Sequence, residues 1–471
     1  MTGAREEEAI VFQDLVVTDS PHEAIPLWVV DDAGFAAWTQ EHGTAAARWL
    51  ETSGFKPKPG ELTLLPGTDG APAGAVLGVK RADALGPWDL APAAAKLPAG
   101  HYRLEAAAET IGQSLLGWML AHYRFDRYKS DARPLEPRVL MAPAGAPLEE
   151  SLRLAQAVAL VRDLVNTPAS DMGPEALANA VRDTVQPYGA SVRTIVGDDL
   201  IAANFPAVHA VGRASAQAPR LIDVTWGDET HPRLTLVGKG VTFDTGGLDI
   251  KPSSAMLLMK KDMGGAAHAL ALARLVMEAK LPVRLRLLIP AVENAVSGNA
   301  FRPGDVLATR KGLSVEVGNT DAEGRLILCD ALALACEDEP DLLLDFATLT
   351  GAARVALGPE LPALFTPDDD LAADLARHAA AVADPLWRLP LWEPYRDMLN
   401  STVADINNAG EGGFAGAITA ALFLQRFVTS SISWAHFDVY AWSPQNRPAR
   451  PKGGEAMILR ACYALLASRY A

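Results

Sequence analysis

Short runs of apolar residues recur along the chain, and their spacing alternates between the patterns of strands and of helices. In the C-terminal two thirds, these runs predict buried strands over 220–225, 233–243, 283–292, 341–347 and 433–439. The segments between them predict helices over 264–278, 322–337 and 415–428. Strands that alternate with helices favour a mostly parallel sheet flanked by helices. Ligands bind such sheets beyond the carboxyl ends of the strands, so polar residues that follow an apolar run are candidates for a site.

The N-terminal part of the chain shows shorter elements between Gly- and Pro-rich stretches, with one amphipathic helix predicted over 108–123. Prolines in 131–150 predict a linker, with a helix that begins near Leu148. We therefore predict an α/β protein of two domains: a smaller N-terminal α/β domain over 1–140 and a larger C-terminal domain over 141–471, which holds the mostly parallel sheet.

Composition places the chain of 471 residues among globular proteins, with 49% hydrophobic and 21% charged residues. The formal net charge of −15 argues against nucleic acid and anionic membranes as partners. The sequence contains no apolar run long enough for a membrane span, and its acidic N-terminus lacks the apolar segment of a secretory signal. Three cysteines cannot form a disulfide framework and fit a reducing compartment. We therefore expect a cytoplasmic protein.

Lys239 and Asp244 lie near the end of the strand predicted over 233–243, with glycines on both sides. A lysine in this setting invites comparison with a phosphate-binding loop, which requires an earlier glycine and a Ser or Thr directly after the lysine. No glycine occurs in 230–237, and Gly240 follows Lys239. The phosphate-binding loop is therefore excluded.

Three further acids stand at the beginnings of two predicted helices. Asp262 precedes the helix over 264–278, whereas Asp321 and Glu323 stand with Arg325 at the start of the helix over 322–337. Each acid alone could cap its helix or interact favourably with the helix dipole. Two acids this close repel each other unless a positive group lies between them, which favours a bound cation.

Four carboxylates and one lysine can together serve a pair of divalent ions, and the candidates are Asp244, Asp262, Asp321, Glu323 and Lys239. A lysine ligates only as the neutral amine, so the pKa of Lys239 has to be lowered by cations and burial. Lys251 and Arg325 remain to meet an oxyanion or hold a small anion. The HExxH and GxSxG motifs are absent, which disfavours thermolysin-like and serine hydrolases.

The segments 239–251, 262–267 and 319–325 resemble the leucyl aminopeptidase (cytosol aminopeptidase) family of dinuclear metallopeptidases. The third segment reads Asn-Thr-Asp-Ala-Glu-Gly-Arg, a highly specific string that is intact here. Flanking stretches extend the resemblance over residues 120–465, and the N-terminal part matches only in size and general character.

The resemblance implies a metal-dependent aminopeptidase that releases N-terminal amino acids from peptides by attack of a metal-bridging water on the scissile carbonyl. Two divalent ions per subunit, zinc or manganese, would be bound. One ion would be held by Asp244, Asp321 and Glu323, with the Asp321 carbonyl as a further ligand. The other would be held by Lys239, Asp244, Asp262 and Glu323.

The resemblance also assigns the remaining roles. Lys251 would polarise the scissile carbonyl, and Arg325 would hold a bicarbonate ion that acts as general base. The substrate's free α-amino group would bind one metal ion. The substrate pocket would be lined by Met259, Thr348, Leu349 and Gly351. Members of the family assemble as hexamers, so a homohexamer that acts on peptides is expected.

Near the C-terminus the chain departs from the family pattern, which often has Ala and Gly soon after the histidine that corresponds to His436. Here Tyr440 and Trp442 are bulkier, so the preference for leucine is open. We interpret His436 as a buried structural histidine rather than a catalytic base.

Three further points stay open at the level of sequence. Asp405, Asn407 and Asn408 precede a Gly-rich stretch and form either an active-site loop or a surface turn. A dinuclear amidase or esterase that acts on other amino-acid derivatives is a rival function. A catalytically inactive scaffold or binding protein that keeps the fold is another.

Overall fold

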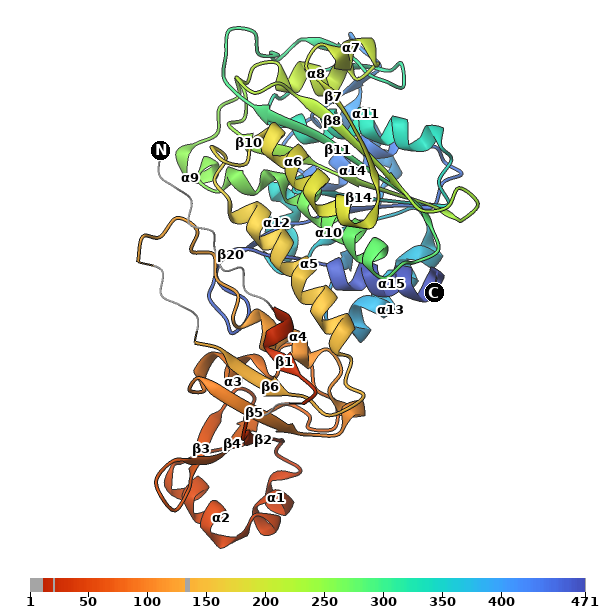
Figure 1. Cartoon of the computed structure of the whole chain (residues 1–471). Coiled ribbons are helices and arrows are strands. Elements are labelled where there is room, and N and C mark those ends of the chain that lie inside the picture. The colour runs from red at the N-terminus through yellow and green to blue at the C-terminus, as the bar shows by residue number, and fades with distance from the viewer. Residues whose placement is uncertain (1–11, 20–21, 132–135, 471) are drawn as a thin grey trace. The chain divides into compact units, whose positions relative to one another are not determined.

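The chain folds into two compact units in a computed structural model that describes residues 12–19, 22–131 and 136–470 (Figure 1). The first unit comprises the chain up to residue 159 and the segment 445–452, and the second comprises 160–444 and the chain from residue 453. The acidic N-terminus and part of the predicted linker lie outside the described residues. Helix α5 (Leu148–Asn166) begins where the sequence predicts and runs across the division. No helix in the described ranges is long and apolar enough to cross a membrane.

The first unit is built on a six-stranded sheet in the order β1-β6-β5-β2-β4-β3. All neighbouring strands are parallel except β3 and β4 at one edge. The strands are β1 (Val16–Val17), β2 (Ile25–Val30), β3 (Leu62–Pro66), β4 (Pro72–Gly78), β5 (Gly100–Glu105) and β6 (Arg138–Met141). The helices before α5 are α1 (Phe35–Glu41), α2 (Gly43–Thr52), α3 (Ala91–Lys96) and α4 (Ser114–Leu120).

The helix predicted over 108–123 is shorter than the pattern suggests. A 3-10 turn covers Ala108–Thr110, and α4 begins only at Ser114. Gly112 separates the two with a φ of 51°, in the left-handed region that a continuous right-handed helix cannot include. A Cβ atom at this position would also lie 2.9 Å from the Leu85 carbonyl oxygen. The apolar spacing therefore continues across Gly112, although the backbone at this residue interrupts the helix.

The second unit is built on a nine-stranded sheet, with the path β16-β15-β18-β14-β9-β11-β8-β7 and with β10 paired to β11. The central strands β11, β9, β14 and β18 are parallel, and so is β10 to β11. Antiparallel pairs join β15 to β18, β8 to β11 and β7 to β8. The predicted mostly parallel sheet is confirmed. Its strands are β7 (Ser191–Val196), β8 (Arg220–Trp226), β9 (Arg233–Gly238), β10 (Gly240–Asp244), β11 (Arg284–Asn294), β14 (Leu342–Ala347), β15 (Ala363–Phe365), β16 (Trp387–Arg388) and β18 (Trp434–Asp438).

The single strand predicted over 233–243 is interrupted at Lys239, where β9 ends and β10 begins. The Lys239 N–H donates to the carbonyl oxygen of Phe346 in β14 at 2.9 Å. Its carbonyl oxygen instead accepts from the N–H of Ala266 at 2.8 Å, in the first turn of helix α10 (Gly264–Glu278). The backbone therefore leaves the regular ladder at the residue predicted to be a ligand.

Two central helices cover opposite faces of this sheet. Helix α10 (Gly264–Glu278) packs on β9 and β14, and α11 (Glu323–Glu337) packs on β9 and β11. The buried apolar cluster around α11 contains residues of β9 and β11 but none of α10. Gly265 lets α10 approach closely, because a Cβ atom there would collide with the Phe346 carbonyl group.

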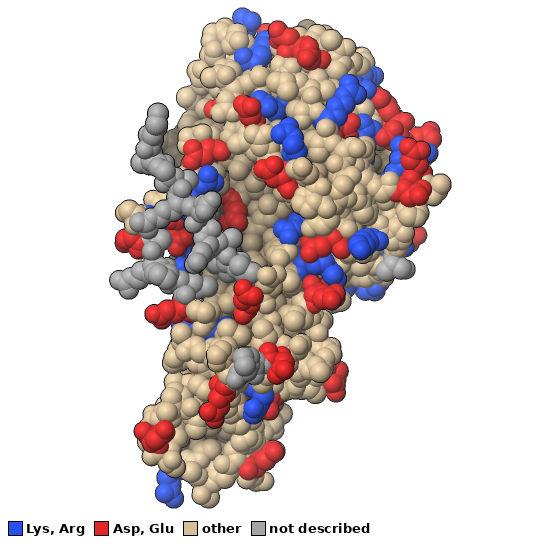
Figure 2. Space-filling model, in the orientation of Figure 1, with Lys and Arg blue, Asp and Glu red and all other residues tan. Residues whose placement is uncertain are grey.

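The remaining elements complete the second unit. The helices are α6 (Pro174–Val185), α7 (Asp199–Ala202), α8 (Pro206–Gly212), α9 (Ser253–Met256), α12 (Gly351–Leu357), α13 (Asp369–Ala381), α14 (Gly416–Gln425) and α15 (Leu459–Tyr470). The short strands are β12 (Val306–Ala308), β13 (Ser314–Glu316), β17 (Ile406–Asn407), β19 (Trp442–Ser443) and β20 (Gly453–Gly454). On the face shown in Figure 2, basic side chains are interspersed with acidic ones, so charges of both signs are spread over this surface.

Candidate active site

The carboxyl ends of the parallel strands bring the predicted site residues to one edge of the sheet. Lys239 follows β9, Asp244 ends β10, and Thr348 follows β14. Asp262 lies in a 3-10 turn (Met259–Met263) directly before α10, and Glu323 is the first residue of α11. This edge is where open α/β sheets bind their ligands.

Three carboxylates form the centre of the site. Asp244, Asp262 and Glu323 are buried, and each offers a ligand oxygen such that the three atoms lie within 4.8 Å of one another. The ammonium of Lys239 lies 2.7 Å from Asp262 Oδ2 and 3.0 Å from Glu323 Oε1. Gly324 allows this arrangement, because a Cβ atom there would stand 2.5 Å from Lys239 Cε.

A second lysine joins the other two acids. The ammonium of Lys251 lies 2.8 Å from Asp244 Oδ2 and also forms an ion pair with Asp321. Asn294, at the end of β11, donates from Nδ2 to Asp244 Oδ1 at 2.8 Å and so orients this carboxylate. Sequence reasoning missed Asn294, although it closely follows the strand predicted over 283–292.

The carboxylates in this cluster raise one another's pKa values. Burial and the neighbouring Asp244 raise the pKa of Asp321 to about 6. Burial, Asp244 and Asp262 raise the pKa of Glu323 to about 8. Glu323 Oε2 is buried without a hydrogen-bond partner among the described residues. Crowded carboxylates with an unpartnered oxygen are a donor set that fits divalent cations.

The alternative interpretation of these acids as helix caps is wrong. The N-cap residue of α10 is Met263 and that of α11 is Ala322, and neither helix has a side-chain cap hydrogen bond. The Asp262 carboxylate instead accepts from Thr348 Oγ1 at 2.8 Å and faces Lys239. The acids at these helix starts are therefore turned toward each other and toward the lysines.

The pKa of Lys239 differs from the sequence-based expectation. Burial disfavours the ammonium, but Asp262, Glu323 and Asp244 together raise the pKa above its usual range. The expected lowering depends on nearby cations, and the protein's own charges act in the opposite direction. The positive charge of Lys239 thus compensates part of the negative charge of the buried carboxylates.

Arg325 is buried and does not line the cavity. Its Nη1 donates to the carbonyl oxygen of Asn408 at 2.7 Å, while its Nε has no partner among the described residues. Burial lowers the pKa of Arg325 to about 10. Asn408 Oδ1 accepts from the N–H of Gly318 at 2.8 Å, so Asn408 supports the loop that carries Asp321.

Asp405 and His436, which the sequence analysis also considers, make contacts away from the cavity. Asp405 accepts from the N–H and the hydroxyl of Ser314 in an exposed turn. His436 is buried, and its Nδ1 lies 2.6 Å from Asp345 Oδ1. Asp345 Oδ2 accepts from Trp434 Nε1 at 2.7 Å. His436 is not among the residues that line the cavity, in agreement with a structural histidine.

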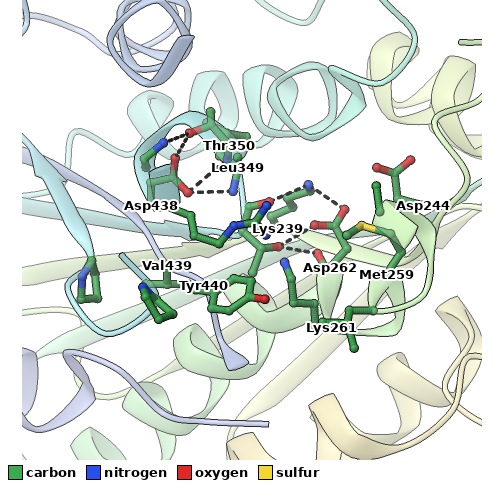
Figure 3. A pocket seen from close by; sticks show the side chains of 18 of the residues that line it. Lys239, Asp244, Met259, Lys261, Asp262, Leu349, Thr350, Asp438, Val439 and Tyr440 are labelled. Atoms are coloured by element: carbon green, nitrogen blue, oxygen red, sulfur yellow. Dashed lines mark hydrogen bonds and ion pairs between the residues drawn. The ribbon is translucent and has the colours of Figure 1, made fainter. Parts of the chain in front are cut away.

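A cavity of about 430 Å³ opens beside the carboxylates (Figure 3). The four residues expected to contact substrate all line it: Met259, Thr348, Leu349 and Gly351. Asp438 accepts from the N–H groups of Leu349 and Thr350 at 3.0 and 3.2 Å and so fixes the loop after β14.

The cavity also contains residues that sequence reasoning missed. Lys261 and Arg354 line it together with Tyr440, one of the two bulky departures from the family pattern. Trp442, the other departure, is buried and lies outside the lining, with Lys260 Nζ at 5.8 Å from its ring centroid. For Lys261 the sequence offers one signal, its place directly before Asp262.

Comparison with known proteins agrees with this site. Residues 159–463 match the family described as "Cytosol aminopeptidase family, catalytic domain". Residues 25–141 match "M17 aminopeptidase, N-terminal domain". The probable cytosol aminopeptidase of Leifsonia xyli subsp. xyli is 39% identical over 462 residues, which are 92% of each chain. That of Roseiflexus castenholzii is 41% identical over 374 residues, or 76% of each chain.

Solved structures agree as well. The cytosol aminopeptidase from Coxiella burnetii has a TM-score of 0.92 and 46% identity, covering 97% of this chain and all of its own (100%). The bottromycin maturation enzyme BotP in complex with Mn has a TM-score of 0.85 and 34% identity, covering 95% of this chain and 99% of its own. On these matches, this chain belongs to the cytosol aminopeptidase family of hydrolases.

Proposed function

We propose that the protein is an aminopeptidase that depends on two divalent metal ions per subunit, zinc or manganese, and releases N-terminal amino acids from peptides. The observation that carries the proposal is the buried group of Asp244, Asp262 and Glu323 beside a cavity of substrate size. When bound, the two ions would supply a bridging water activated as nucleophile and a docking point for the substrate's free α-amino group.

Each ion would be held by its own set of residues, and two residues would belong to both sets. Asp244 and Glu323 would serve both ions, and their carboxylates belong to the group whose ligand oxygens lie within 4.8 Å of one another. Asp321, with its side chain and its carbonyl oxygen, would complete one site. Lys239 and Asp262 would complete the other, with the lysine as the neutral amine. The similarity to BotP, whose structure is a complex with Mn, supports manganese as one candidate.

Two positive groups would assist the reaction. The Lys251 ammonium lines the cavity and would stabilise the negative charge that develops on the scissile carbonyl oxygen. Arg325, buried with an unpartnered Nε, would hold a bicarbonate ion that accepts a proton from the attacking water. Met259, Thr348, Leu349 and Gly351 would contact the substrate.

The proposal extends to the state of the protein in the cell. We place the boundary between the N-terminal α/β domain and the catalytic domain at residues 140–141, and we propose a homohexamer in the cytoplasm that acts on peptides. Nucleic acid and membranes are not among the proposed partners.

The rival functions are less well supported by the residues. A catalytically inactive scaffold would lose ligands freely, yet all five candidate ligands, Lys251 and Arg325 are present. A dinuclear amidase or esterase would use the same cluster and differs in its substrate.

A panel of aminoacyl p-nitroanilides tests the proposal on chelator-stripped protein reconstituted with single metals. We expect no turnover after stripping, recovery with manganese or zinc, and no turnover of N-acetylated substrates. Absence of turnover on the whole panel would overturn the proposal. Equal turnover of free and N-acetylated substrates would favour the amidase.

A further inference from the structure

Lys261 is a buried lysine in the wall of the substrate cavity. Only 5% of the residue is exposed, and it lines the cavity. Its ammonium lies 5.1 Å from the centroid of the Tyr440 ring. Figure 3 shows the side chain between Asp262 and Tyr440. Among the described residues, its ammonium forms no ion pair.

A second cation contacts the same aromatic ring. The guanidinium carbon of Arg354 lies 5.0 Å from the Tyr440 centroid, and Arg354 lines the same cavity. We call Lys261, Arg354 and Tyr440 the cationic wall. The attraction between a cation and an aromatic ring is weaker than the attraction to a carboxylate, so the ring does not replace a carboxylate partner for a buried ammonium.

The nearby carboxylates are already occupied by other partners. Asp262 Oδ2 faces Lys239 at 2.7 Å, and Asp262 Oδ1 accepts from Thr348. Asp438 accepts from two backbone N–H groups with Oδ1 and from the Thr350 hydroxyl with Oδ2 at 2.6 Å. The cationic wall is therefore without an anionic partner of its own in the described part of the chain.

We propose that the cationic wall selects substrates whose N-terminal residue carries a side-chain carboxylate, aspartate or glutamate. This inference rests on the proposed aminopeptidase function. Lys261 directly precedes Asp262, so a substrate amine held at the acids would have its own side chain close to the wall. A leucine side chain there would leave a buried charge unpaired, whereas a carboxylate would form a charge-assisted hydrogen bond with it.

The first test compares glutamyl and leucyl p-nitroanilides on the manganese-loaded protein. For the wild type we expect kcat/KM to be about tenfold higher for the glutamyl substrate, and Lys261→Met to lower it by about 10–100-fold. Turnover of the leucyl substrate by Lys261→Met should rise, because the variant no longer leaves a buried charge unpaired beside the leucine side chain. Lys311→Met, which changes an exposed lysine outside the cavity, is the matched control.

The second test measures binding without turnover. Calorimetric titration of the loaded protein should show tighter binding of free L-glutamate than of L-leucine, and Lys261→Met should abolish the difference. Lys261→Glu, checked for folding by its melting temperature, should shift preference toward N-terminal lysine or arginine.

The outcomes separate the two proposals. A wild type that turns over leucyl but not glutamyl substrates, or a Lys261→Met variant that loses both activities equally, would overturn the cationic wall as a specificity device. No turnover of any substrate would overturn the aminopeptidase function instead. In that case the glutamate–leucine difference in the titration would still decide what the wall binds.

Discussion

The two sides of the cavity beside the carboxylates are built in opposite ways. On one side, Asp244, Asp262 and Glu323 crowd together and are met at short distances by the protein's own lysines. On the other side, Lys261 and Arg354 share a single aromatic ring and pair with no carboxylate of the described chain.

Under the two proposals, the carboxylate side would carry out the reaction and the cationic wall would select the substrate. The carboxylate side consists of residues in the specific strings shared with the family, and its three buried carboxylates could hold a metal ion. The cationic wall depends on Tyr440, where the chain departs from the family pattern. Keeping the first side would preserve a reaction, and changing the second would redirect it to another substrate.

The largest effect is expected from Asp262→Ala. Removing this ligand should release metal and reduce turnover to background for every substrate, because the carboxylate side serves all of them. Metal content by elemental analysis and turnover on the substrate panel measure the effect, with the melting temperature as a control for folding. A metal-replete, active variant would show that Asp262 is not a ligand.

Lys251→Ala should lower kcat by about 10²–10³-fold, as expected for the loss of one oxyanion donor. Metal content should stay at the wild-type level, because Lys251 is not among the proposed metal ligands. The loss should be the same for leucyl and glutamyl substrates. A loss confined to the glutamyl substrate would show that Lys251 acts with the cationic wall in selecting the substrate.

Activity should rise between pH 6 and 8 by about 10–50-fold, because an α-amino group titrates near pH 8 and only its neutral form can bind a metal. The sign follows from the amine: protonation at lower pH removes the ligand. A pH profile of kcat/KM measures this. A flat profile between pH 6 and 9 would contradict docking of the amine at the carboxylate side.

Arg325→Ala should lower kcat by about tenfold, as for residues that act behind the ligands. The residue lies outside the cavity and would act through a bound anion. Added bicarbonate should stimulate the wild type but not the variant. Equal stimulation of both would remove Arg325 from the proposed role.

The smallest effect is expected from Arg354→Met. This residue is exposed, so its contribution to binding an acidic side chain should be about 2–5-fold in kcat/KM and weaker at high salt. Leucyl turnover should not change. An effect as large as that of Lys261→Met would show that Arg354 contributes as much as Lys261 to binding the acidic side chain.

Much of the fold could be predicted because the catalytic unit alternates regular elements. The helix predicted over 264–278 has the observed ends of α10. Local irregularities are missed where one residue overrides the pattern. The turn of the Lys239 carbonyl toward α10 divides one predicted strand, and Gly112 ends a predicted helix.

The site shows the same limit. The strings around Asp244, Asp262 and Glu323 carry their chemistry within a few residues, so the ligand candidates could be chosen from the sequence. Asn294 acts through a hydrogen bond to a distant segment, and no local pattern distinguishes it from ordinary polar residues. The sequence offers Asn408 as part of an active-site loop or a surface turn, but its hydrogen bond to Gly318 depends on the fold.

The sequence by itself determined the α/β alternation, the acids at the strand and helix ends, and the family. Only the tertiary structure decided that Lys261, Arg354 and Tyr440 lie around one cavity. The physical reason is that these residues follow different strands. Periodicity along the chain reports which face of an element is buried, whereas the pairing of parallel strands decides which loops meet at the edge of the sheet.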